Sequence, residues 1–296
     1  MDGPRADPDA GIVDLIEPDA AGGFDSYFDP AEFALRASLE DQHYWHLHRR
    51  GVLRDVIASA CPDASLPLVE LGCGVGTVAT YLNEAGFHVD YADVHTEGLR
   101  IARERARARG VAVNGREARR FFRVDITRGL PPGAYGGALL LDVLEHLPDD
   151  RAPLRAVRGA LRAPEGQTPF VLFTVPAFQM LWSPWDDVEK HKRRYTLSEA
   201  RTLAGDTGFE VVRATYFFFP LFFAASAVKA LRVSRDALSR QAAAPRFAEL
   251  TETKNNPVLN RAMLTLLGAE RRWLSRRDLP LGTSILVLAT PRRHGA

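Results

Sequence analysis

Three alternate glycines follow a short apolar run in residues 69–76, which read VELGCGVG. They are Gly72, Gly74 and Gly76. Glycine lets the backbone turn tightly and come close to a ligand, and a helix that begins after the turn offers free amide groups. The spacing is G-x-G-x-G with the acid Glu70 before it. The dinucleotide fingerprint G-x-G-x-x-G needs a glycine where this chain has Thr77, which opposes a nicotinamide dinucleotide here.

Three later apolar runs end in acids. Asp93 stands in YADVH, Asp125 in VDI and Asp142 in LLLDVLEHL. His146 follows the third run, and an imidazole that titrates near neutral pH suits proton abstraction from an acidic hydroxyl. Each residue also has a simpler interpretation: Asp93 alone would be a solvated acid or a helix N-cap, and His146 a packing residue.

Asp142, Glu145 and His146 form a compact group of two carboxylates and one imidazole. These side chains are ligands for Mg²⁺ or Zn²⁺. The same acids serve a cofactor equally well, so we predict no metal site, and a divalent ion stays an alternative.

A second group of polar and aromatic residues lies in LWSPWDDVEKHKRRYT, residues 181–196. His191, Arg194 and Tyr195 could bind an anionic substrate group or supply a second base. Trp182 and Trp185 favour this functional interpretation over an exposed loop with ordinary ion pairs, because tryptophan is costly to leave in a solvated loop.

Short apolar runs alternate with amphipathic stretches from residue 66 onward, which is typical of βαβ units and a parallel sheet. We expect strands over 66–71, 88–94, 121–124, 137–141, 170–175, 210–216 and 284–290. We expect helices over 77–85, 97–109, 152–163 and 197–207, the last begun by a capping box at TLSE.

The remaining segments define the domain organisation. We expect a disordered tail over 1–25, a helical lead-in over 26–65, a core over 66–216 and 283–292, and a helical cap over 217–282. The cap contains the apolar run YFFFPLFFAASAV, in which Pro220 suits a helix start and Phe222 and Phe223 are predicted to line an acceptor pocket. Packing onto the sheet or shallow membrane contact are the alternatives for this run.

The pattern E-x-G-x-G-x-G resembles motif I of the class I S-adenosylmethionine-dependent methyltransferases, and the three acid-ended runs agree with that family in order and spacing. The resemblance implies a Rossmann-like, seven-stranded, mostly parallel sheet with helices on both faces. It also implies that S-adenosylmethionine binds, with S-adenosylhomocysteine as the product. Asp93 would hold the ribose hydroxyls, and Asp125 the adenine. The cofactor-binding residues that it implies are Glu70, Gly72, Gly74, Gly76, Asp93, Val94, Asp125, Ile126 and Asp142.

The fourth strand with its LLLDVLEHL ending is similar to the small-molecule branch of the family, which includes the ubiquinone-type O-methyltransferases. Residues 181–196 resemble a substrate-side loop of a bacterial subgroup, and HYWHLHRR, which begins at His43, resembles the lead-in of the same subgroup. The lead-in helix would then close over the cofactor, with Tyr44 as apolar cover and Arg49 near the methionine carboxylate. A plain packing helix is the alternative.

Composition narrows the function classes. The chain has 296 residues with 46% hydrophobic residues and a formal net charge of +1, which gives no electrostatic argument for nucleic acid. The two cysteines, Cys61 and Cys73, cannot build a disulfide framework, and the acidic, proline-containing start does not read as a secretory signal. We expect a cytoplasmic protein without a membrane span.

The sequence therefore predicts methyl transfer to a small, fairly hydrophobic acceptor, foremost at oxygen, with a guessed role in secondary metabolism. His146 and His191 are the candidate catalytic bases. The substrate-binding candidates are Trp182, Trp185, Arg194, Tyr195, Phe222 and Phe223. Methylation of nitrogen or carbon, a nicotinamide-dependent oxidoreductase and a non-catalytic cofactor-binding scaffold are the alternatives, while the missing D/N-P-P-Y and Pro-Cys motifs oppose a nucleobase methylase.

Overall fold

The structure of the chain is a computed structural model that describes residues 5–7, 11–16, 30–61, 63–115, 117–236 and 256–292. Its strands are β1 (Arg5–Asp7), β2 (Ile12–Asp14), β3 (Pro67–Leu71), β4 (His88–Asp93), β5 (Phe121–Arg123), β6 (Gly137–Leu141), β7 (Phe170–Pro176), β8 (Phe209–Phe217) and β9 (Ser284–Pro291). Its α-helices are α2 (Pro30–Glu40), α3 (Tyr44–Ala60), α4 (Thr77–Glu84), α5 (Thr96–Ala108), α6 (Arg151–Ala160), α7 (Pro184–Val188), α8 (Leu197–Asp206), α9 (Phe219–Asp236) and α11 (Pro257–Leu274). Two short 3₁₀ helices are η1 (Leu144–His146) and η2 (Gln179–Leu181).

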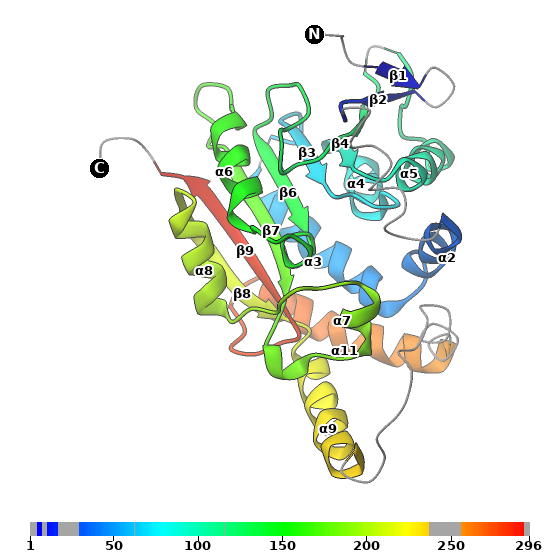
Figure 1. Cartoon of the computed structure of the whole chain (residues 1–296), viewed down its shortest axis with the longest axis vertical. Coiled ribbons are helices and arrows are strands. Elements are labelled where there is room, and N and C mark those ends of the chain that lie inside the picture. The colour runs from blue at the N-terminus through cyan, green and yellow to red at the C-terminus, as the bar shows by residue number, and fades with distance from the viewer. Residues whose placement is uncertain are drawn as a thin grey trace.

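The described strands form one sheet in the order β1-β2-β5-β4-β3-β6-β7-β9-β8 (Figure 1). Neighbours from β2 to β7 are parallel, and β9 runs antiparallel to both β7 and β8. The predicted Rossmann-like sheet, mostly parallel with helices on both faces, is confirmed, but the described residues form nine strands rather than the predicted seven, because β1 and β2 add to one edge. Strand order reverses between β3 and β6, and in such sheets ligands bind outside the carboxyl ends of the strands at this reversal.

The N-terminal tail differs from the expectation. We predicted disorder over residues 1–25, but β1 and β2 pair with each other, and β2 adds to the edge of the sheet beside β5. Ile12 is buried in the core, and Arg123 forms an ion pair with Asp14. One buried apolar side chain and one ion pair thus hold β2 against the sheet, although its sequence lacks the hydrophobic periodicity of a strand.

Helices cover both faces of the sheet. The core of one face includes apolar side chains of α3, α4, α5 and α11, and the core of the other face includes those of α6 and α8. Every residue of β7 is buried, as expected for a strand that is covered on both sides. The predicted capping box of α8 is also present, with Thr196 and Glu199 as its members.

The part of residues 217–282 that the structure describes is mostly helical, as predicted, with α9 and α11 before β9. α9 does begin at Phe219, with Pro220 in its first turn as predicted. However, α11 packs against α3, and its Leu267 and Leu274 are buried in the core of one sheet face. The interval between β8 and β9 therefore supplies part of the layer that covers the sheet, because its apolar residues bury themselves against α3.

One buried acid, Glu270 of α11, joins three helices. Its Oε1 lies 2.9 Å from His48 Nε2 of α3. The same carboxylate accepts hydrogen bonds from the backbone N–H groups of Phe218 and Phe219, where α9 begins. Phe218 has a positive φ of 62°, an unfavourable backbone conformation for a bulky residue. The two hydrogen bonds hold the chain in this turn and fix the direction in which α9 leaves β8.

We predict that Glu270→Ala lowers the free energy of unfolding by about 3 kcal/mol, because it leaves two buried N–H donors and a buried histidine without their partner. Chemical denaturation measures the change. Glu104→Ala, at an exposed position of α5, is the control and should change stability by no more than about 0.5 kcal/mol. Equal effects of the two substitutions would contradict the role of Glu270.

Candidate active site

The glycine turn lies at the carboxyl end of β3, where the strand order reverses. Gly72, Gly74 and Gly76 all have positive φ, between 53° and 77°. A Cβ on Gly72 would lie 2.6 Å from the Val143 side chain, and one on Gly76 would lie 2.6 Å from Ala102. A Cβ on Gly74 would meet nothing within 4 Å. Two glycines thus permit close packing beneath the turn, and the third leaves its backbone open to a ligand.

Asp93, at the end of β4, holds this turn in place. Its Oδ2 accepts a hydrogen bond of 2.7 Å from the Gly74 N–H, and its Oδ1 accepts one of 2.9 Å from the His95 N–H. The carboxylate is buried, and each oxygen retains a second lone pair for a hydroxyl donor. The structure therefore brings the predicted ribose acid and the predicted glycine turn together.

Glu70 lies under the same turn rather than facing a ligand. Its Oε2 accepts a hydrogen bond of 2.7 Å from the Ala79 N–H in the first turn of α4. Burial raises the pKa of the Glu70 carboxyl to about 8, although Arg49 opposes the shift. Its contacts position the start of α4, and its role in cofactor binding stays a prediction.

The predicted adenine-side residues lie at the carboxyl end of β5 and beside it. Ile126 is buried, while the Asp125 Oδ1 accepts hydrogen bonds from the N–H and the hydroxyl of Thr127. Val94 is half-buried, and its carbonyl accepts from Arg123 Nε. Asp125 thus stabilises the conformation of its own loop. Its Oδ2 lies 3.5 Å from Arg128 Nε, so this oxygen can bind a ligand only when that ion pair opens.

Arg49 of α3 reaches the end of β6 and binds a predicted cofactor acid. Its Nη2 lies 2.7 Å from Asp142 Oδ2, and Thr174 donates to the other oxygen of Asp142. Asp142 itself has a φ of 57°, so it occupies the left-handed region directly after the strand. The lead-in helix is therefore joined to the sheet at the ligand end, as predicted for a segment that closes over the cofactor.

The apolar part of the lead-in packs against the start of α9. Trp45 stacks on Phe218 at a centroid distance of 5.2 Å, and the Arg49 guanidinium lies over the Trp45 ring. Tyr44 is half-buried, and its N–H donates to Asn260 Oδ1 of α11. These contacts agree with apolar cover, but the cofactor role of Tyr44 stays a prediction.

A second helix, α2, also covers the glycine turn, and sequence reasoning named none of its site contacts. Thr77, which begins α4, donates a short hydrogen bond to Glu40 at the end of α2. Phe33 is buried beside Gly98 and the His95 ring. The sequence held no specific signal for these contacts, because they join segments that are far apart along the chain.

His146 and His191 lie side by side, although 45 positions separate them. Their ring centroids are 4.8 Å apart, and the planes are nearly perpendicular. His191 Nδ1 lies 2.9 Å from Asp186 Oδ1, which orients the ring, and Nε2 lies 3.9 Å from Glu145 Oε1. Asp186 was missed as a functional residue, although it lies in the segment 181–196 and closes a capping box with Ser183.

The surroundings of the two rings shift the pKa values of His146 and Asp186. Burial, with help from His191, lowers the pKa of His146 to about 3, so this ring is neutral near pH 7. Burial opposes ionisation of Asp186, but hydrogen bonds from His191 and Arg194 outweigh it and hold its pKa below the usual range. Asp186 is therefore a carboxylate, and it stabilises a proton on His191 when that ring accepts one.

Glu145 is fully buried between these groups. Neither of its oxygens has a hydrogen-bond partner among the described residues, and burial raises its pKa well above the usual value. One ligand atom each of Glu145, His146 and His191 lies within 4.8 Å of the others, which is close enough for a shared divalent ion. Asp142, the third member of the group considered from the sequence, is held by Arg49 and Thr174 instead.

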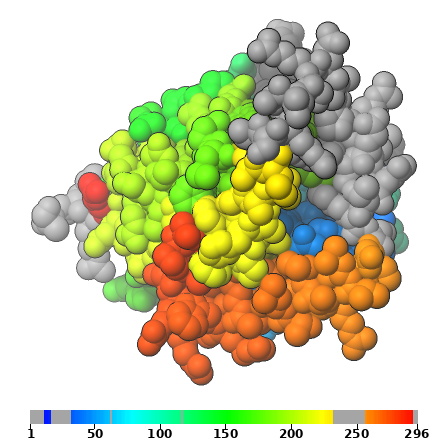
Figure 2. Space-filling model, turned by 90° about the horizontal axis from the view of Figure 1, so that it is seen from below, coloured from blue at the N-terminus to red at the C-terminus, as the bar shows by residue number. Residues whose placement is uncertain are grey.

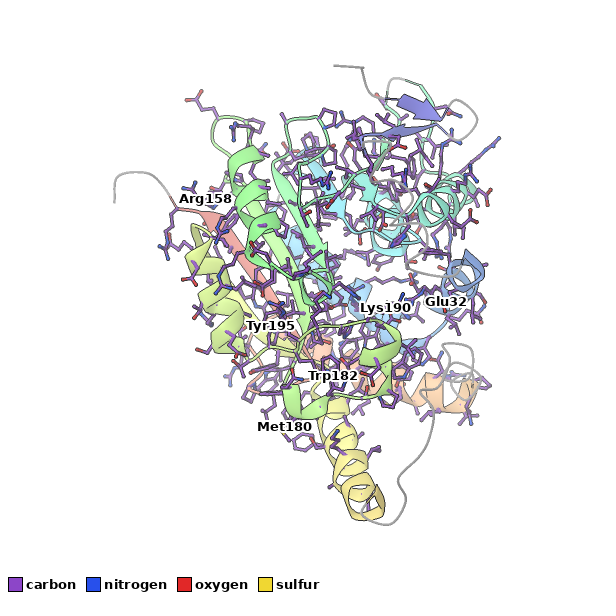
Figure 3. The ribbon with its side chains drawn as sticks, viewed as in Figure 1. Glu32, Arg158, Met180, Trp182, Lys190 and Tyr195 are labelled. Atoms are coloured by element: carbon purple, nitrogen blue, oxygen red, sulfur yellow. The ribbon has the colours of Figure 1, made fainter. Side chains whose placement is uncertain are left out.

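The other substrate-side candidates have partners within the protein. Arg194 forms two hydrogen bonds with Asp186, and the Tyr195 hydroxyl donates to Asp150. Trp182 Nε1 donates to Asp187, and Trp185 is half-buried. Figure 3 shows Trp182 and Tyr195 on the segment that crosses the carboxyl end of the sheet. Arg194 and Tyr195 stabilise this segment, and their contact with a substrate stays a prediction.

The predicted aromatic pocket residues of α9 divide into one packed and one exposed side chain. Phe222 lies 5.4 Å from the Phe178 ring, which in turn stacks on Tyr216. Phe223 is 53% exposed. Phe222 is thus placed beside the substrate-side segment, whereas Phe223 faces outward.

The chain is similar to known methyltransferases. A family described as a methyltransferase domain matches residues 44–214. The ubiquinone biosynthesis O-methyltransferase of Ralstonia nicotianae is 32% identical over 137 residues, 43% of this chain and 55% of that protein. The enzyme of the same name from Albidiferax ferrireducens is 29% identical over 138 residues, 43% of this chain and 52% of that protein. The chain spans about half the length of the curated relatives it matches.

A solved structure supports the fold alone. It is a chain of the complex between the Haloferax volcanii Trm112 methyltransferase activator and a methyltransferase, with a TM-score of 0.55 and 15% identity. The alignment covers 89% of this chain and 97% of that one.

The depressed pKa of His146 predicts a pH dependence of stability. The ring binds a proton below about pH 6.5 in the unfolded chain but only near pH 3 in the folded one, so stability falls as pH falls through this window. His146→Gln should remove up to about 1.4 kcal/mol per pH unit of this slope between about pH 6 and pH 4. Urea denaturation at each pH, with a chelator present, measures it. An unchanged slope would show that His146 is not held neutral.

Proposed function

The chain belongs to the methyltransferase family, as a class I S-adenosylmethionine-dependent enzyme, and we propose that it methylates a hydroxyl of a small, fairly hydrophobic acceptor. The observation that supports this most is the His191–Asp186 pair beside His146, which follows the carboxyl end of β6. The nicotinamide-dependent oxidoreductase and the non-catalytic scaffold, both open from the sequence, are set aside by the family assignment.

S-adenosylmethionine, when bound, supplies a methyl group on a positively charged sulfur, and transfer is an in-line displacement. The enzyme must hold the acceptor oxygen in line with the methyl group and remove the proton of the hydroxyl. His191 is suited to accept that proton at Nε2, because Asp186 holds Nδ1 and stabilises the protonated ring. His146 is a poor base at neutral pH, since its pKa is about 3, and we assign it the role of a neutral neighbour that fixes the His191 ring.

Residues of the chain fit the cofactor without rearrangement of the sheet. Gly74 leaves its backbone open, Asp93 retains lone pairs for two hydroxyl donors, and Arg49 offers a cation near Asp142 for a carboxylate. Arg49 already pairs with Asp142, so a methionine carboxylate would share or replace that partner.

The acceptor is inferred from the lining of the substrate side. Trp182, Trp185 and Phe222 are half-buried aromatic side chains. The two tryptophans lie in residues 181–196 with His191, and Phe222 lies beside Phe178. Such a lining suits an apolar acceptor with one reactive hydroxyl. The relatives named as O-methyltransferases support oxygen as the methylated atom over nitrogen or carbon. Those relatives are named for ubiquinone biosynthesis, so the guess of secondary metabolism has no support among them.

The setting of the enzyme is part of the same proposal. Cys61 and Cys73 are both free and buried, as is common in a reducing compartment, which supports a cytoplasmic location.

A divalent ion is the second candidate for activation of the acceptor, because Glu145, His146 and His191 lie close enough to hold one. Two imidazoles and a carboxylate suit Zn²⁺ or a similar ion, which would lower the pKa of a bound hydroxyl. In that case Glu145 would be ionised, and His191 would be a ligand instead of the base.

The cofactor assignment predicts that Asp93→Ala weakens S-adenosylmethionine binding about thirtyfold or more, which corresponds to about 2–3 kcal/mol for charge-assisted hydrogen bonds. Titration calorimetry with S-adenosylmethionine, S-adenosylhomocysteine and NAD measures the affinities. Asp206→Ala, a change at an exposed acid of α8, is the control and should leave them unchanged. Unaltered cofactor affinity of Asp93→Ala, or tighter binding of NAD, would reject the assignment.

The assignment of the base predicts that His191→Ala lowers kcat by about 10² or more and leaves cofactor affinity nearly intact. The assay follows labelled methyl transfer to a panel of small phenols. His146→Ala should lower kcat less, because this ring is not the proton acceptor. A larger loss of kcat for His146→Ala than for His191→Ala would show that His146 is the proton acceptor. If a chelator abolishes the activity and Zn²⁺ or Mg²⁺ restores it, a metal ion and not the histidine base activates the acceptor.

A further inference from the structure

Most of the exposed large apolar side chains of the described residues gather on two helices. Those of α9 and α11 are Phe223, Val228, Leu231, Val258, Leu259, Leu266 and Trp273. Met180 of η2 lies next to α9, and Val212 of β8 is the other large apolar side chain of comparable exposure among the described residues. Figure 2 shows α9 and α11 together on one face of the molecule. We call this set of seven side chains the α9/α11 face.

The apolar residues of α11 follow a helical stripe. At 3.6 residues per turn, Val258, Leu259, Leu266 and Trp273 fall within an arc of about 100°. The buried Leu267 and Leu274 lie on a different side of the helix, against the sheet. α11 is thus apolar on two sides, and core packing accounts for only one of them. An exposed patch of this extent on a soluble domain marks a site of interaction.

Exposed basic residues outnumber exposed acidic residues beside the stripe. Exposed cations are Lys229, Arg261, Arg272, Arg276 and Arg277. Residues 219–231 contain no acid, and the acids of residues 256–278 are the buried Glu270, which accepts from the Phe218 and Phe219 N–H groups, and the exposed Asp278, which pairs with Arg213. The whole chain has a formal charge of only +1, so positive charge is concentrated on this face. Arg277 also lies over the Trp273 ring, an aromatic and cationic pairing suited to an interface between apolar and aqueous phases.

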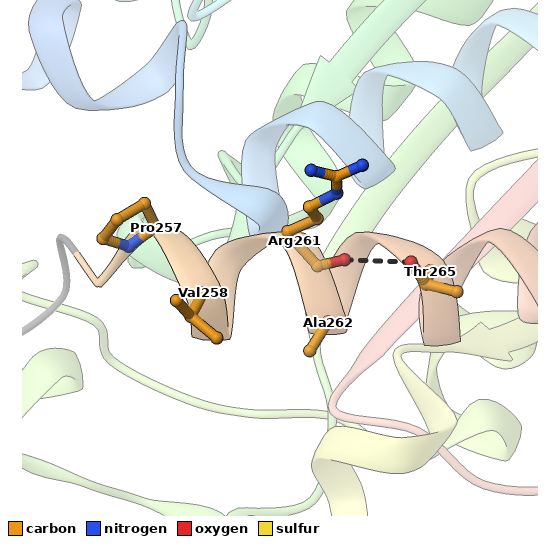
Figure 4. Close-up of a pocket in the computed structure, with 5 residues that line it drawn as sticks. All are labelled: Pro257, Val258, Arg261, Ala262 and Thr265. Carbon is orange, nitrogen blue, oxygen red and sulfur yellow. Dashed lines mark hydrogen bonds between the residues drawn. The ribbon is translucent and has the colours of Figure 1, made fainter.

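The α9/α11 face is hollowed at the start of α11. Pro257, Val258, Arg261, Ala262 and Thr265 line an open hollow of about 440 Å³ (Figure 4). Apolar side chains of α11 form much of its lining, and Arg261 stands at its edge. The hollow suits an acyl chain with an anionic group beside it better than a compact polar ligand.

Contacts connect this face directly to the candidate active site. Lys229 of α9 donates to the carbonyl of Trp182 on the substrate-side segment. Asn260 of α11 accepts from the Tyr44 N–H and donates to the Gln42 carbonyl, so it holds the start of the lead-in helix. The face thus borders the elements through which a hydrophobic acceptor would enter.

We propose that the α9/α11 face docks on the surface of an anionic phospholipid membrane, with both helices lying in the plane of the interface. Apolar side chains insert among the acyl chains, and the flanking cations meet the negatively charged head groups. None of the described helices is long and apolar enough to cross a bilayer. A second copy of the chain fits this face poorly, because a two-fold interface would bring its own cations together.

Vesicle co-sedimentation of the full chain tests the proposal without any acceptor. Binding is expected to vesicles with about a third phosphatidylglycerol, but not to pure phosphatidylcholine, and about 1 M salt should release the protein because it screens head-group attraction. Arg272→Glu/Arg276→Glu should weaken binding by at least about 25-fold, since each cation contributes about fivefold. Leu231→Gln/Val258→Gln, at positions that are 68% and 77% exposed, should weaken it by about tenfold or more.

Matched controls lie on other elements of the fold. Arg107→Glu/Arg155→Glu, on α5 and α6, and Val212→Gln, on β8, should bind vesicles like the wild type. All variants should keep the cofactor affinity and the melting temperature of the wild type, which excludes misfolding.

The proposal fails if the wild-type chain ignores anionic vesicles, or if the control variants lose binding as much as the face variants do. It also fails if sedimentation velocity shows a dimer that the face variants dissociate. Vesicle binding without any hydroxyl methylation would leave the docking surface intact and reject only the proposed acceptor.

Discussion

The whole carboxyl end of the sheet depends on one constraint, the left-handed backbone of Gly72, Gly74 and Gly76 and its hydrogen bond to Asp93. A side chain at Gly72 or Gly76 would overlap Val143 or Ala102, so the end of β6 and α5 can approach the turn only because these positions lack a Cβ. Asp93 then fixes the turn from the next strand with hydrogen bonds to two backbone N–H groups. A ligand that accepts this geometry meets an open backbone at Gly74 with a carboxylate directly beneath it.

Segments from the two ends of the chain close around that turn through charged and aromatic contacts. Arg49 ties α3 to Asp142, and Glu40 ties α2 to Thr77. Glu270 links α3 to the start of α9, so the lead-in and the helices after β8 form one connected wall. The same wall bears the apolar and basic outer surface. The proposed cofactor site, the proposed acceptor side and the outer surface are therefore built from the same few helices, and a change in the packing of α11 would affect all three.

Sequence reasoning predicted what is local and periodic. The strands, the glycine turn, Asp93 and the capping box of α8 each depend on neighbours within a few residues, and the structure places them as expected. The prediction of disorder was wrong for β1 and β2, because a strand of three residues carries no periodic signal. The order of β2 comes from its pairing with β5. The helices between β8 and β9 were predicted, but the burial of Leu267 was not, because it depends on α3, some 200 positions earlier. Asp186 and Glu40 were missed for the same reason, since the contacts that give them a role join distant segments or depend on a loop conformation.

The central claim is that the glycine turn, Asp93 and the two lead-in helices together enclose S-adenosylmethionine. Hydrogen–deuterium exchange of the full chain with and without S-adenosylhomocysteine tests it most directly, because exchange reports the opening of backbone hydrogen bonds segment by segment. The account predicts that the ligand slows exchange in residues 70–79, 93–97 and 33–50, with little change in α6 and α8. Protection confined to other segments, or equal protection of these segments by NAD, would contradict it.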